Sequence, residues 1–479
     1  MNYPFVMVIF GATGDLAQNK LLPALFSLFK QNKLPNSFHI IGYSRRNLTN
    51  EGFRCFFTDM VSQKGWPDFA RHLIYQQGDF EQRYGYEELI NKLINLDKAL
   101  GKYLIRFLYL ATPPQNYETI LGFLDSSGLS KGYGHPSRDS GQNWTRIIVE
   151  KPFGKDLETA ISLDKKLSLL FEENQIFRVD HYLGKEIVQN MVAFRFANGV
   201  FEPVWNKNHI DHIQITFFEE KGIGNRGKFF DGIGLLRDVG QNHLMQLIAG
   251  VAMEQPRSFT KEDLRNERAR VIKAIRPMEE EDVLRFVVRG QYDGYTKEKN
   301  VPQDSNTETF VAMKFFIDTK RLQNIPFYVR AGKKMPKNIV EISIVFIQTC
   351  HILFKEYGCP EIGNVLTIRI QPDEGINLRV IAKSPGAKLA LGRVDMKFSY
   401  QEQFKTRGIE AYDRILLDIF AGDQMLFNRS DELGSSWKFI TKILNGWKNQ
   451  ESKIKNYGLG TWGPKEAQDL IERDGRKWL

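Results

Sequence analysis

The stretch FVMVIFGATGDL, residues 5–16, places six apolar residues directly before a turn that contains two glycines. A short apolar run that ends in a turn is typical of a buried β-strand, and the segment that follows, residues 16–30, has the spacing of a helix. Glycines between a strand and a helix let the backbone approach a pyrophosphate, and the first N–H groups of the helix attract anions. The spacing is G-x-x-G and not the full G-x-G-x-x-G, so an ordinary tight turn remains the alternative at this point.

Strands alternate with helices from this motif to about residue 178. Alternation of this kind predicts βαβ units and a parallel sheet. Pro23 lies inside the first helical segment and should kink or shorten it. The further strands expected here are FHIIGYS (38–44), IRFLYLATPP (105–114) and TRIIVEKPFG (145–154), and the helices are YEELINKLINLDKAL (86–100) and LETAISLDKKLSLLFEE (157–173).

The second part of the chain has a different pattern, in which alternating strand-like runs follow one another without helices between them. The runs are residues 212–220, 309–318, 325–332, 339–348, 365–372 and 376–384. They favour a mainly antiparallel sheet with helices on one face. We therefore predict an α/β plus α+β protein. Its N-terminal Rossmann-like dinucleotide-binding domain would span residues 1–179, and a larger α+β domain would span residues 180–479.

Length and composition agree with two globular domains. The chain has 479 residues, of which 42% are hydrophobic and 26% charged, and this is too long for one ordinary core. Three cysteines, Cys55, Cys350 and Cys359, are too few and too scattered for a disulfide framework or a metal site, which indicates a reducing compartment. The start of the chain lacks the features of a signal peptide, and no apolar run approaches the roughly 20 residues that span a bilayer. We expect a cytoplasmic protein.

The formal net charge of +9 is compatible with two kinds of partner. A nucleic-acid-binding protein would gather its Lys and Arg residues on one element, whereas here they are dispersed among acids. The longest basic stretch is RAGKKMPK, residues 330–337. Small anions such as phosphorylated metabolites account for the charge at least as well.

Arg45 and Arg46 follow the second predicted strand. An acidic residue at this place would bind the ribose 2′-hydroxyl of NAD, whereas arginine suits the 2′-phosphate of NADP. The alternative is a loop with two solvated arginines.

RVDHYLGKEIVQNM, residues 178–191, gathers four kinds of polar group where a strand meets a helix. Asp180 is an acceptor, His181 an imidazole, Tyr182 a phenol and Lys185 an ammonium group. The ordinary alternative is a polar loop that caps a helix.

GIGLLRDVGQNHLMQLIAG, residues 232–250, has apolar residues at a helical period and polar residues among them. His243 lies four residues after the apolar Val239, hence on or beside the buried face. A core histidine is the common alternative, yet burying Asp238, Gln241, Asn242 and His243 together costs free energy unless they are paired.

His209 and His212 lie on a predicted strand, where positions three apart face opposite sides. No cysteine or further histidine supports them as ligands, so we predict no metal.

Several motifs together resemble the glucose-6-phosphate dehydrogenase family, in that family's order and over essentially the whole chain. They are GATGDLAQNK (11–20), EKPFG (150–154), RVDHYLGKE (178–186), FFDGIGLLRDVGQNHL (229–244), RAGKK (330–334), RIQPDEG (369–375), DQMLFNRSDEL (423–433) and YGLGTWGPKEAQDLI (457–471). The resemblance implies oxidation of D-glucose 6-phosphate to 6-phospho-D-glucono-1,5-lactone with NADP, the first step of the pentose phosphate pathway. It also implies a homodimer or homotetramer.

The resemblance further implies roles for single residues. His243 would take the proton of the anomeric hydroxyl, and Asp180 would orient and charge its imidazole, whose ordinary pKa of about 6.5 suits a base near neutral pH. The implied substrate-binding residues are Lys151, His181, Tyr182, Lys185, Glu219, Asp238, Lys333 and Gln371. The implied cofactor-binding residues are Gly11, Thr13, Gly14, Asp15, Leu16, Arg45 and Lys151.

The chain departs from the family pattern after RAGKK, where the family usually has a second basic residue and this chain has Asn338. Lys337 stands one position earlier, and we assign no role to either residue. Three rival functions remain: another NAD(P)-dependent sugar or inositol dehydrogenase, a non-catalytic NADP-binding regulator, and a nucleic-acid-binding protein. The second would be expected to have lost the base or the phosphate-binding residues, which are all present.

Overall fold

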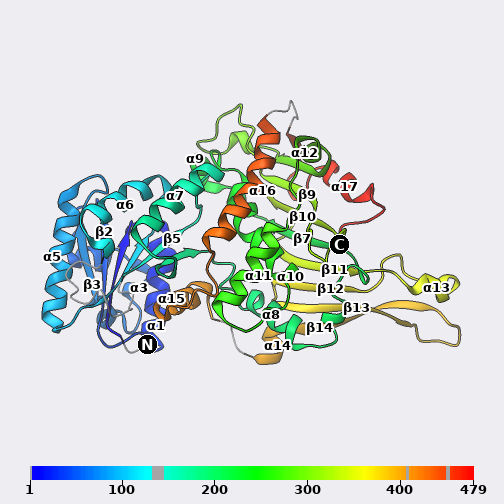
Figure 1. Ribbon diagram of the computed structural model, residues 1–479, viewed down its shortest axis with the longest axis horizontal. Helices are drawn as coiled ribbons and strands as arrows, with labels where there is room; N and C mark the ends of the chain where they lie inside the picture. The colour runs from blue at the N-terminus through cyan, green and yellow to red at the C-terminus, as the bar shows by residue number, and fades with distance from the viewer. Residues whose placement is uncertain (1–2, 132–144, 406–408, 449–453) are drawn as a thin grey trace. The chain divides into compact units, whose positions relative to one another are not determined.

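The computed structural model describes residues 3–131, 145–405, 409–448 and 454–479 (Figure 1). The chain forms two compact units. The first unit contains residues 1–184, 260–262 and 409–433, and the second contains residues 185–259, 263–408 and 434–479. Residues 409–433, which the division by sequence assigns to the second domain, thus pack with the first unit.

The first unit is built on a six-stranded sheet with the order β3-β2-β1-β4-β5-β6, in which every pair is parallel. This order, with a reversal next to β1, is that of the Rossmann fold and confirms the prediction. Every residue of β1 is buried because helices cover both faces of the sheet. The strands are β1 (Phe5–Phe10), β2 (Phe38–Ser44), β3 (Leu73–Gln77), β4 (Ile105–Leu110), β5 (Thr145–Glu150) and β6 (Ile176–Val179).

Helices lie on both faces of this sheet (Figure 1). One face carries α1 (Leu22–Lys30) and α15 (Ala411–Ala421), and the other carries α5 (Arg83–Leu100), α6 (Tyr117–Ser126) and α7 (Leu157–Leu170). Three short helices, α2 (Asn50–Cys55), α3 (Thr58–Val61) and α4 (Trp66–Ala70), connect β2 to β3.

Pro23 does not end the first helix. A π-helical turn, η1 (Ala17–Leu21), comes directly before α1, so Pro23 lies in the first turn of α1. The backbone is helical from Asp15 to Lys30, and the change from π to α hydrogen bonding directly before Pro23 accommodates its missing N–H.

The second unit contains a nine-stranded sheet with the order β14-β13-β12-β11-β7-β10-β9-β8-β15. The β7–β10 and β8–β15 pairs are parallel and the others are antiparallel, which confirms the mainly antiparallel prediction. The strands are β7 (Ile210–Glu219), β8 (Val287–Tyr292), β9 (Phe310–Phe316), β10 (Pro326–Lys333), β11 (Ile339–Phe346), β12 (Val365–Gln371), β13 (Gly375–Lys383), β14 (Leu391–Ser399) and β15 (Lys455–Tyr457).

Helices α8 (Glu186–Ala197), α10 (Met245–Ala252) and α11 (Lys261–Lys273) lie over one face of this sheet (Figure 1). A π-helix, η7 (Leu236–Leu244), runs directly into α10. The remaining helices are α9 (Gly227–Phe230), α12 (Glu280–Phe286), α13 (Cys350–Phe354), α14 (Tyr400–Phe404), α16 (Ser430–Lys448) and α17 (Lys465–Glu472).

The cysteines, predicted to be too few and too scattered for a disulfide framework, include one bonded pair. Cys350 and Cys359 form a disulfide, with their Cα atoms 5.9 Å apart, and Cys55 is free and exposed. The chain between the two cysteines folds back through α13, which brings together residues that look scattered in the sequence.

Among the described helices, we find none that combines the length and the apolar character needed to cross a membrane.

Candidate active site

The glycine turn after β1 is held by the two neighbouring strands. Gly11 has φ of +90°, and its N–H donates to the carbonyl oxygen of Tyr43 at 2.9 Å. A Cβ atom at Gly11 would lie 2.6 Å from the Ala111 carbonyl oxygen, so both the conformation and the space require glycine. The turn therefore occupies the reversal point of the sheet, where dinucleotides bind in this fold.

The rest of the turn leads into the first helix. The Gly14 N–H donates to the Gly11 oxygen at 2.9 Å, and the Thr13 and Ser44 hydroxyl oxygens are 2.8 Å apart. Helical geometry begins at Asp15 and Leu16. The turn and the helix start together form a cradle whose bare backbone fits a pyrophosphate.

Arg45 and Arg46 both lie exposed after the end of β2. The Arg46 guanidinium stacks over the ring of Phe56 at 4.9 Å. The Tyr75 hydroxyl fixes this loop by donating to the Arg46 carbonyl oxygen at 2.5 Å. Arg46 is thus engaged with a neighbouring ring, while Arg45 extends from the strand end.

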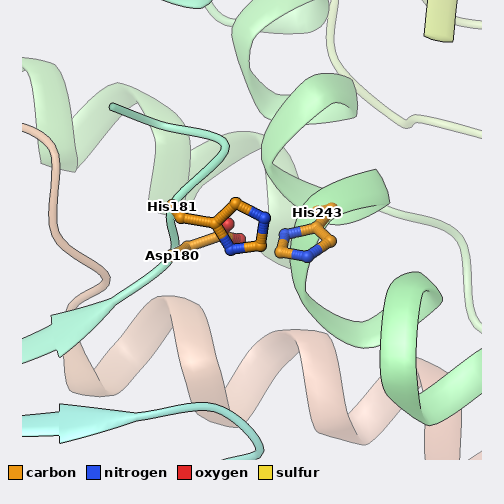
Figure 2. A group of neighbouring side chains, drawn as sticks. All are labelled: Asp180, His181 and His243. Carbon is orange, nitrogen blue, oxygen red and sulfur yellow. The ribbon is translucent and has the colours of Figure 1, made fainter. Parts of the chain in front are cut away.

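Asp180 and His181 follow the last residue of β6 (Figure 2). Lys151 follows the last residue of β5. Asp180 is buried, with 1% of its surface exposed, and its Oδ1 accepts a hydrogen bond from the Tyr182 N–H at 3.0 Å. The His181 ring is nearly parallel to that of Tyr412 of α15, at 6.3 Å. The first unit thus presents a buried carboxylate and an imidazole at the carboxyl edge of its sheet.

Glu150, which the sequence analysis did not select, lies buried beside these groups. The Tyr109 hydroxyl donates to its Oε1 at 2.6 Å, and the Tyr412 hydroxyl donates to the same oxygen at 3.3 Å. Burial raises the pKa of Glu150 to about 7; the hydrogen bonds from Tyr109 and Tyr412 and the charge of Lys151 oppose the rise, and the charge of Asp180 adds to it. The only sequence signal for Glu150 is its place at the end of a strand, in the EKP motif.

In the second unit, Lys185 directly precedes α8 and meets Gln371 at the end of β12. The Lys185 ammonium donates to Gln371 Oε1 at 2.5 Å. Burial lowers the pKa of Lys185 to about 8, and the charge of Glu374 partly opposes this shift. An ammonium group at a helix N-terminus, held by an amide, is well suited to bind a phosphate dianion.

Lys333 joins two of the predicted carboxylates. It ends β10 beside Glu219, the last residue of β7, and its Nζ lies 2.5 Å from Glu219 Oε2 and 3.8 Å from Asp238 Oδ2. Only 1% of the Lys333 surface is exposed. Sugar hydroxyls can donate to such carboxylates and accept from such an ammonium group.

His243 lies within η7 and not, as predicted, in an α-helix (Figure 2). A π-helix joins residues i and i+5 by hydrogen bonds, so Asp238 and His243 fall on the same side of it. The imidazole is buried and lies parallel to the ring of Phe217 at 6.0 Å. The spacing of the apolar residues predicted an α-helix because, over so few residues, it does not distinguish an α-helical turn from a π-helical turn.

Neighbouring side chains satisfy the polar groups of the π-helix. The Asn242 amide donates to the Asp238 carbonyl oxygen at 3.1 Å, and its own oxygen accepts from the His243 N–H at 2.7 Å. Gln241 pairs with Ser436, whose hydroxyl donates to the Gln241 carbonyl oxygen at 2.6 Å. Hydrogen bonds therefore meet part of the cost of burying this polar patch, although the buried Oε1 of Gln241 accepts none from the described residues.

Glu308, also not selected by the sequence analysis, supports the start of the π-helix. Its Oε1 accepts from the Leu236 N–H at 3.0 Å. A Cβ atom at Gly234 would lie 2.3 Å from the same carboxylate oxygen, so glycine makes room for it.

Lys337 and Asn338, the departure from the family pattern, both have local partners. The Lys337 ammonium lies 5.3 Å from the centre of the Trp462 ring, and the Asn338 amide donates to Glu220 Oε2 at 2.7 Å. His209 is exposed, whereas His212 is buried and hydrogen-bonded to Asp211.

Within each unit, the structure brings together part of the predicted set. Lys185 meets Gln371, and Lys333 meets Glu219 and Asp238. The predicted residues of the first unit are Gly11, Thr13, Gly14, Asp15, Leu16, Arg45, Lys151, Asp180, His181 and Tyr182, and they follow the carboxyl ends of β1, β2, β5 and β6. That edge is where parallel sheets bind their ligands.

Comparison with known proteins gives the family. Residues 8–190 match the model "Glucose-6-phosphate dehydrogenase, NAD binding domain", and residues 192–479 match "Glucose-6-phosphate dehydrogenase, C-terminal domain". The glucose-6-phosphate 1-dehydrogenase of Chlamydia pneumoniae is 42% identical, over 99% of this chain and 96% of its own. That of Aggregatibacter actinomycetemcomitans is also 42% identical, over 98% of this chain and 96% of its own.

Solved structures agree with the sequence relatives. A glucose-6-phosphate dehydrogenase in complex with its substrate glucose-6-phosphate has a TM-score of 0.89 and 34% identity, covering 100% of this chain and 99% of that one. The enzyme from Mycobacterium avium has a TM-score of 0.84 and 33% identity, covering 99% of this chain and 98% of that one. These full-length matches, over both units, place the chain in the glucose-6-phosphate dehydrogenase family.

Proposed function

We propose that this protein oxidises D-glucose 6-phosphate with NADP⁺ to 6-phospho-D-glucono-1,5-lactone, the first step of the oxidative pentose phosphate pathway. The observation that carries the proposal is the helix-start ammonium of Lys185, held by Gln371, in a chain that matches the family over its full length. A dehydrogenase acting on an unphosphorylated sugar would have no dianion for that group to bind.

The proposed chemistry is a proton abstraction coupled to hydride loss at the anomeric carbon. The imidazole of His243 takes the proton of the C1 hydroxyl, the C1–O bond becomes a carbonyl, and the C1 hydrogen leaves with its electron pair. NADP⁺, when bound, accepts that hydride. Asp180 orients the imidazole and stabilises the imidazolium that forms, as the carboxylate does in other carboxylate–histidine pairs that act as a general base.

The proposed substrate contacts divide into two groups. His181, Tyr182 and Lys185 would bind the phosphate. Glu219, Asp238, Lys333 and Gln371 would bind the sugar side, with the carboxylates accepting from hydroxyl groups. Lys151, next to the buried Glu150, would lie between sugar and cofactor.

The proposed cofactor is NADP, and the residues present fit it. The bare backbone of Gly11 and Gly14 leaves room for the pyrophosphate, beside Thr13, Asp15 and Leu16. The exposed guanidinium of Arg45 is free of the ring contact that engages Arg46, and would meet the 2′-phosphate.

An absorbance assay at the NADPH band tests the function, with glucose 6-phosphate and glucose offered separately with each nicotinamide cofactor. We expect rapid reduction of NADP⁺ with glucose 6-phosphate and poor use of glucose. Equal use of both sugars would favour the sugar dehydrogenase, and binding of NADP without turnover would favour the regulator.

We also propose that the protein is a homodimer or a homotetramer. The edge strand β14 exposes Val394 and Met396, and α13 exposes Ile352 and Leu353, with 45% to 76% of the surface of each residue accessible. Exposed apolar side chains gathered at one end of a sheet are typical of a surface that contacts another protein. Light scattering should give a multiple of the monomer mass, and Met396→Lys should lower it.

The proposed location is the cytoplasm. The substrate and cofactor are multiply charged phosphates, which do not cross a bilayer unaided. A reducing compartment would hold Cys350 and Cys359 as thiols. Thiol labelling after rapid lysis into acid would find three reactive cysteines if the proposal is right, and a single one if the disulfide persists.

A further inference from the structure

Glu150 is a buried carboxyl group that the proposed mechanism does not use. It ends β5, and only 7% of the residue is exposed. Two phenols from different elements donate to its Oε1: Tyr109 of β4 at 2.6 Å and Tyr412 of α15 at 3.3 Å. A third, Tyr117 of α6, donates to its main-chain oxygen at 2.9 Å. The residue is therefore fixed from three sides.

The charged groups that face Glu150 are those of the proposed active site. Lys151 is the next residue, and Asp180 follows β6, which pairs with β5 so that Glu150 stands opposite Val179. Both charges act on the Glu150 carboxyl, Lys151 favouring its ionised form and Asp180 opposing it. Three phenols, those of Tyr109, Tyr117 and Tyr412, are further titratable groups packed against it.

Two opposing effects place this carboxyl between its charged and neutral forms. Burial disfavours the carboxylate, while phenol donors and a neighbouring ammonium favour it. Burial outweighs the donors and raises the pKa of Glu150 to about 7. The protonated and ionised forms are therefore both populated at neutral pH. A structural carboxylate with a dedicated cation would instead remain ionised throughout this range.

We propose that Glu150 is a proton-exchanging positioning residue, whose carboxyl releases a proton to water and thereby adds a negative charge beside Asp180. The inference rests on the proposed function, in which Asp180 supports the imidazolium of His243. The O–H bond of the Glu150 carboxyl breaks, the proton goes to solvent, and no other reactant is needed. The ionised form stabilises the positive charge that develops during turnover.

Turnover should therefore depend on the charge of Glu150 as well as on that of the base. We expect an added negative charge beside Asp180, at an effective dielectric constant near 20, to change the rate by about tenfold. Glu150→Gln keeps the size and the acceptor oxygen of the side chain but stays neutral at every pH. It is therefore a mimic of the protonated wild type.

The first experiment compares kcat of the wild type and Glu150→Gln between about pH 5.5 and about pH 8.5. We expect a ratio near one at the acid end that rises through about pH 7 to about tenfold. A ratio that stays constant with pH would overturn the proposal, because a purely structural defect acts equally at all pH values.

An infrared titration follows the proton without using turnover. The wild type should show a protonated carboxylic acid band at low pH that disappears through about pH 7, and Glu150→Gln should lack that component. Absence of such a band from the difference between the two proteins would overturn the proposal. Lack of glucose 6-phosphate turnover by the wild type would instead contradict the proposed function, so the two failures can be told apart.

Two tyrosines provide a matched pair of variants. Tyr109→Phe removes a donor to the Glu150 carboxylate, so the infrared midpoint should move to higher pH by about one unit. Tyr117→Phe removes an equally buried hydroxyl that donates to the main-chain oxygen of the same residue, and should leave the midpoint unchanged. Equal shifts in the two variants would mean that a general loosening of the packing around Glu150 moves the midpoint, and this result would overturn the proposal.

Discussion

The turn after β1 and the π-helix η7 both form part of the proposed active site, yet they differ in what they offer to a ligand. The turn offers bare backbone, since a Cβ atom at Gly11 would lie 2.6 Å from a carbonyl oxygen. The π-helix offers side chains, with Asp238 and His243 on one side of a widened helix and Asn242 bonded to its backbone.

This difference predicts that substitutions in the two regions should have different effects. A backbone site tolerates no added atoms, and its loss should appear as weaker cofactor binding. A side-chain site tolerates a substitute of similar shape, and its loss should appear as slower chemistry with little change in binding. The four predictions below separate these two kinds of failure.

His243→Asn should give the largest effect on turnover. Asparagine is close in size and polar, so the fold and much of the glucose 6-phosphate affinity should survive, while kcat falls by about a hundred- to ten-thousandfold. Asp180→Asn should also lower kcat, through loss of orientation and charge. His209→Asn, at an exposed histidine, is the control. If His243→Asn kept more than about a tenth of wild-type turnover, the assignment of the base would be wrong.

Gly11→Ala should weaken NADP binding by about tenfold to a hundredfold, because a φ of +90° and the nearby carbonyl oxygen both oppose a side chain. Glucose 6-phosphate binding, measured by calorimetry, should change far less. Gly122→Ala is a matched control, since nothing lies within 4 Å of a Cβ atom in the middle of α6. Equal loss of both ligands would show that the turn supports the fold and not only the cofactor.

Sequence reasoning predicts the backbone site better than the side-chain site. Gly11 and Gly14 can be recognised because few residues adopt such turns, and the strand before them is an unbroken apolar run. The widened helix around His243 cannot be recognised, because Leu236, Val239 and Leu244 fit an α-helical period as well. Glu150 and Glu308 were missed for another reason: their environment comes from residues distant in the sequence, such as Tyr412 for Glu150 and Leu236 for Glu308.

Lys185→Ala tests a side chain whose task is binding and should raise the KM for glucose 6-phosphate by about ten- to a hundredfold, with a smaller change in kcat. His181→Asn should act in the same direction. Because the pKa of Lys185 is lowered to about 8, its ammonium form is lost as the pH rises through that value, and wild-type affinity should weaken there. Lys185→Arg stays charged and should remove this pH dependence. Equal losses for glucose and glucose 6-phosphate would contradict the phosphate contact.

Arg45→Ala should give the smallest effect, and it tests whether side chains add selectivity to the backbone cofactor site. Wild type should prefer NADP over NAD in kcat/KM by at least about tenfold, equivalent to roughly 1.4 kcal/mol. A guanidinium can donate two parallel hydrogen bonds to a 2′-phosphate, and NAD has no phosphate to lose. Arg45→Ala should therefore reduce the use of NADP and leave the use of NAD nearly unchanged.

Arg46→Ala is the matched comparison, and it should have the weaker effect on cofactor preference because Arg46 is stacked on Phe56. Both cofactors should be measured with all three proteins at one ionic strength, since exposed charges are screened by salt. A wild type that favours NAD, or an Arg45→Ala variant that weakens both cofactors alike, would show that the glycine turn alone determines cofactor binding.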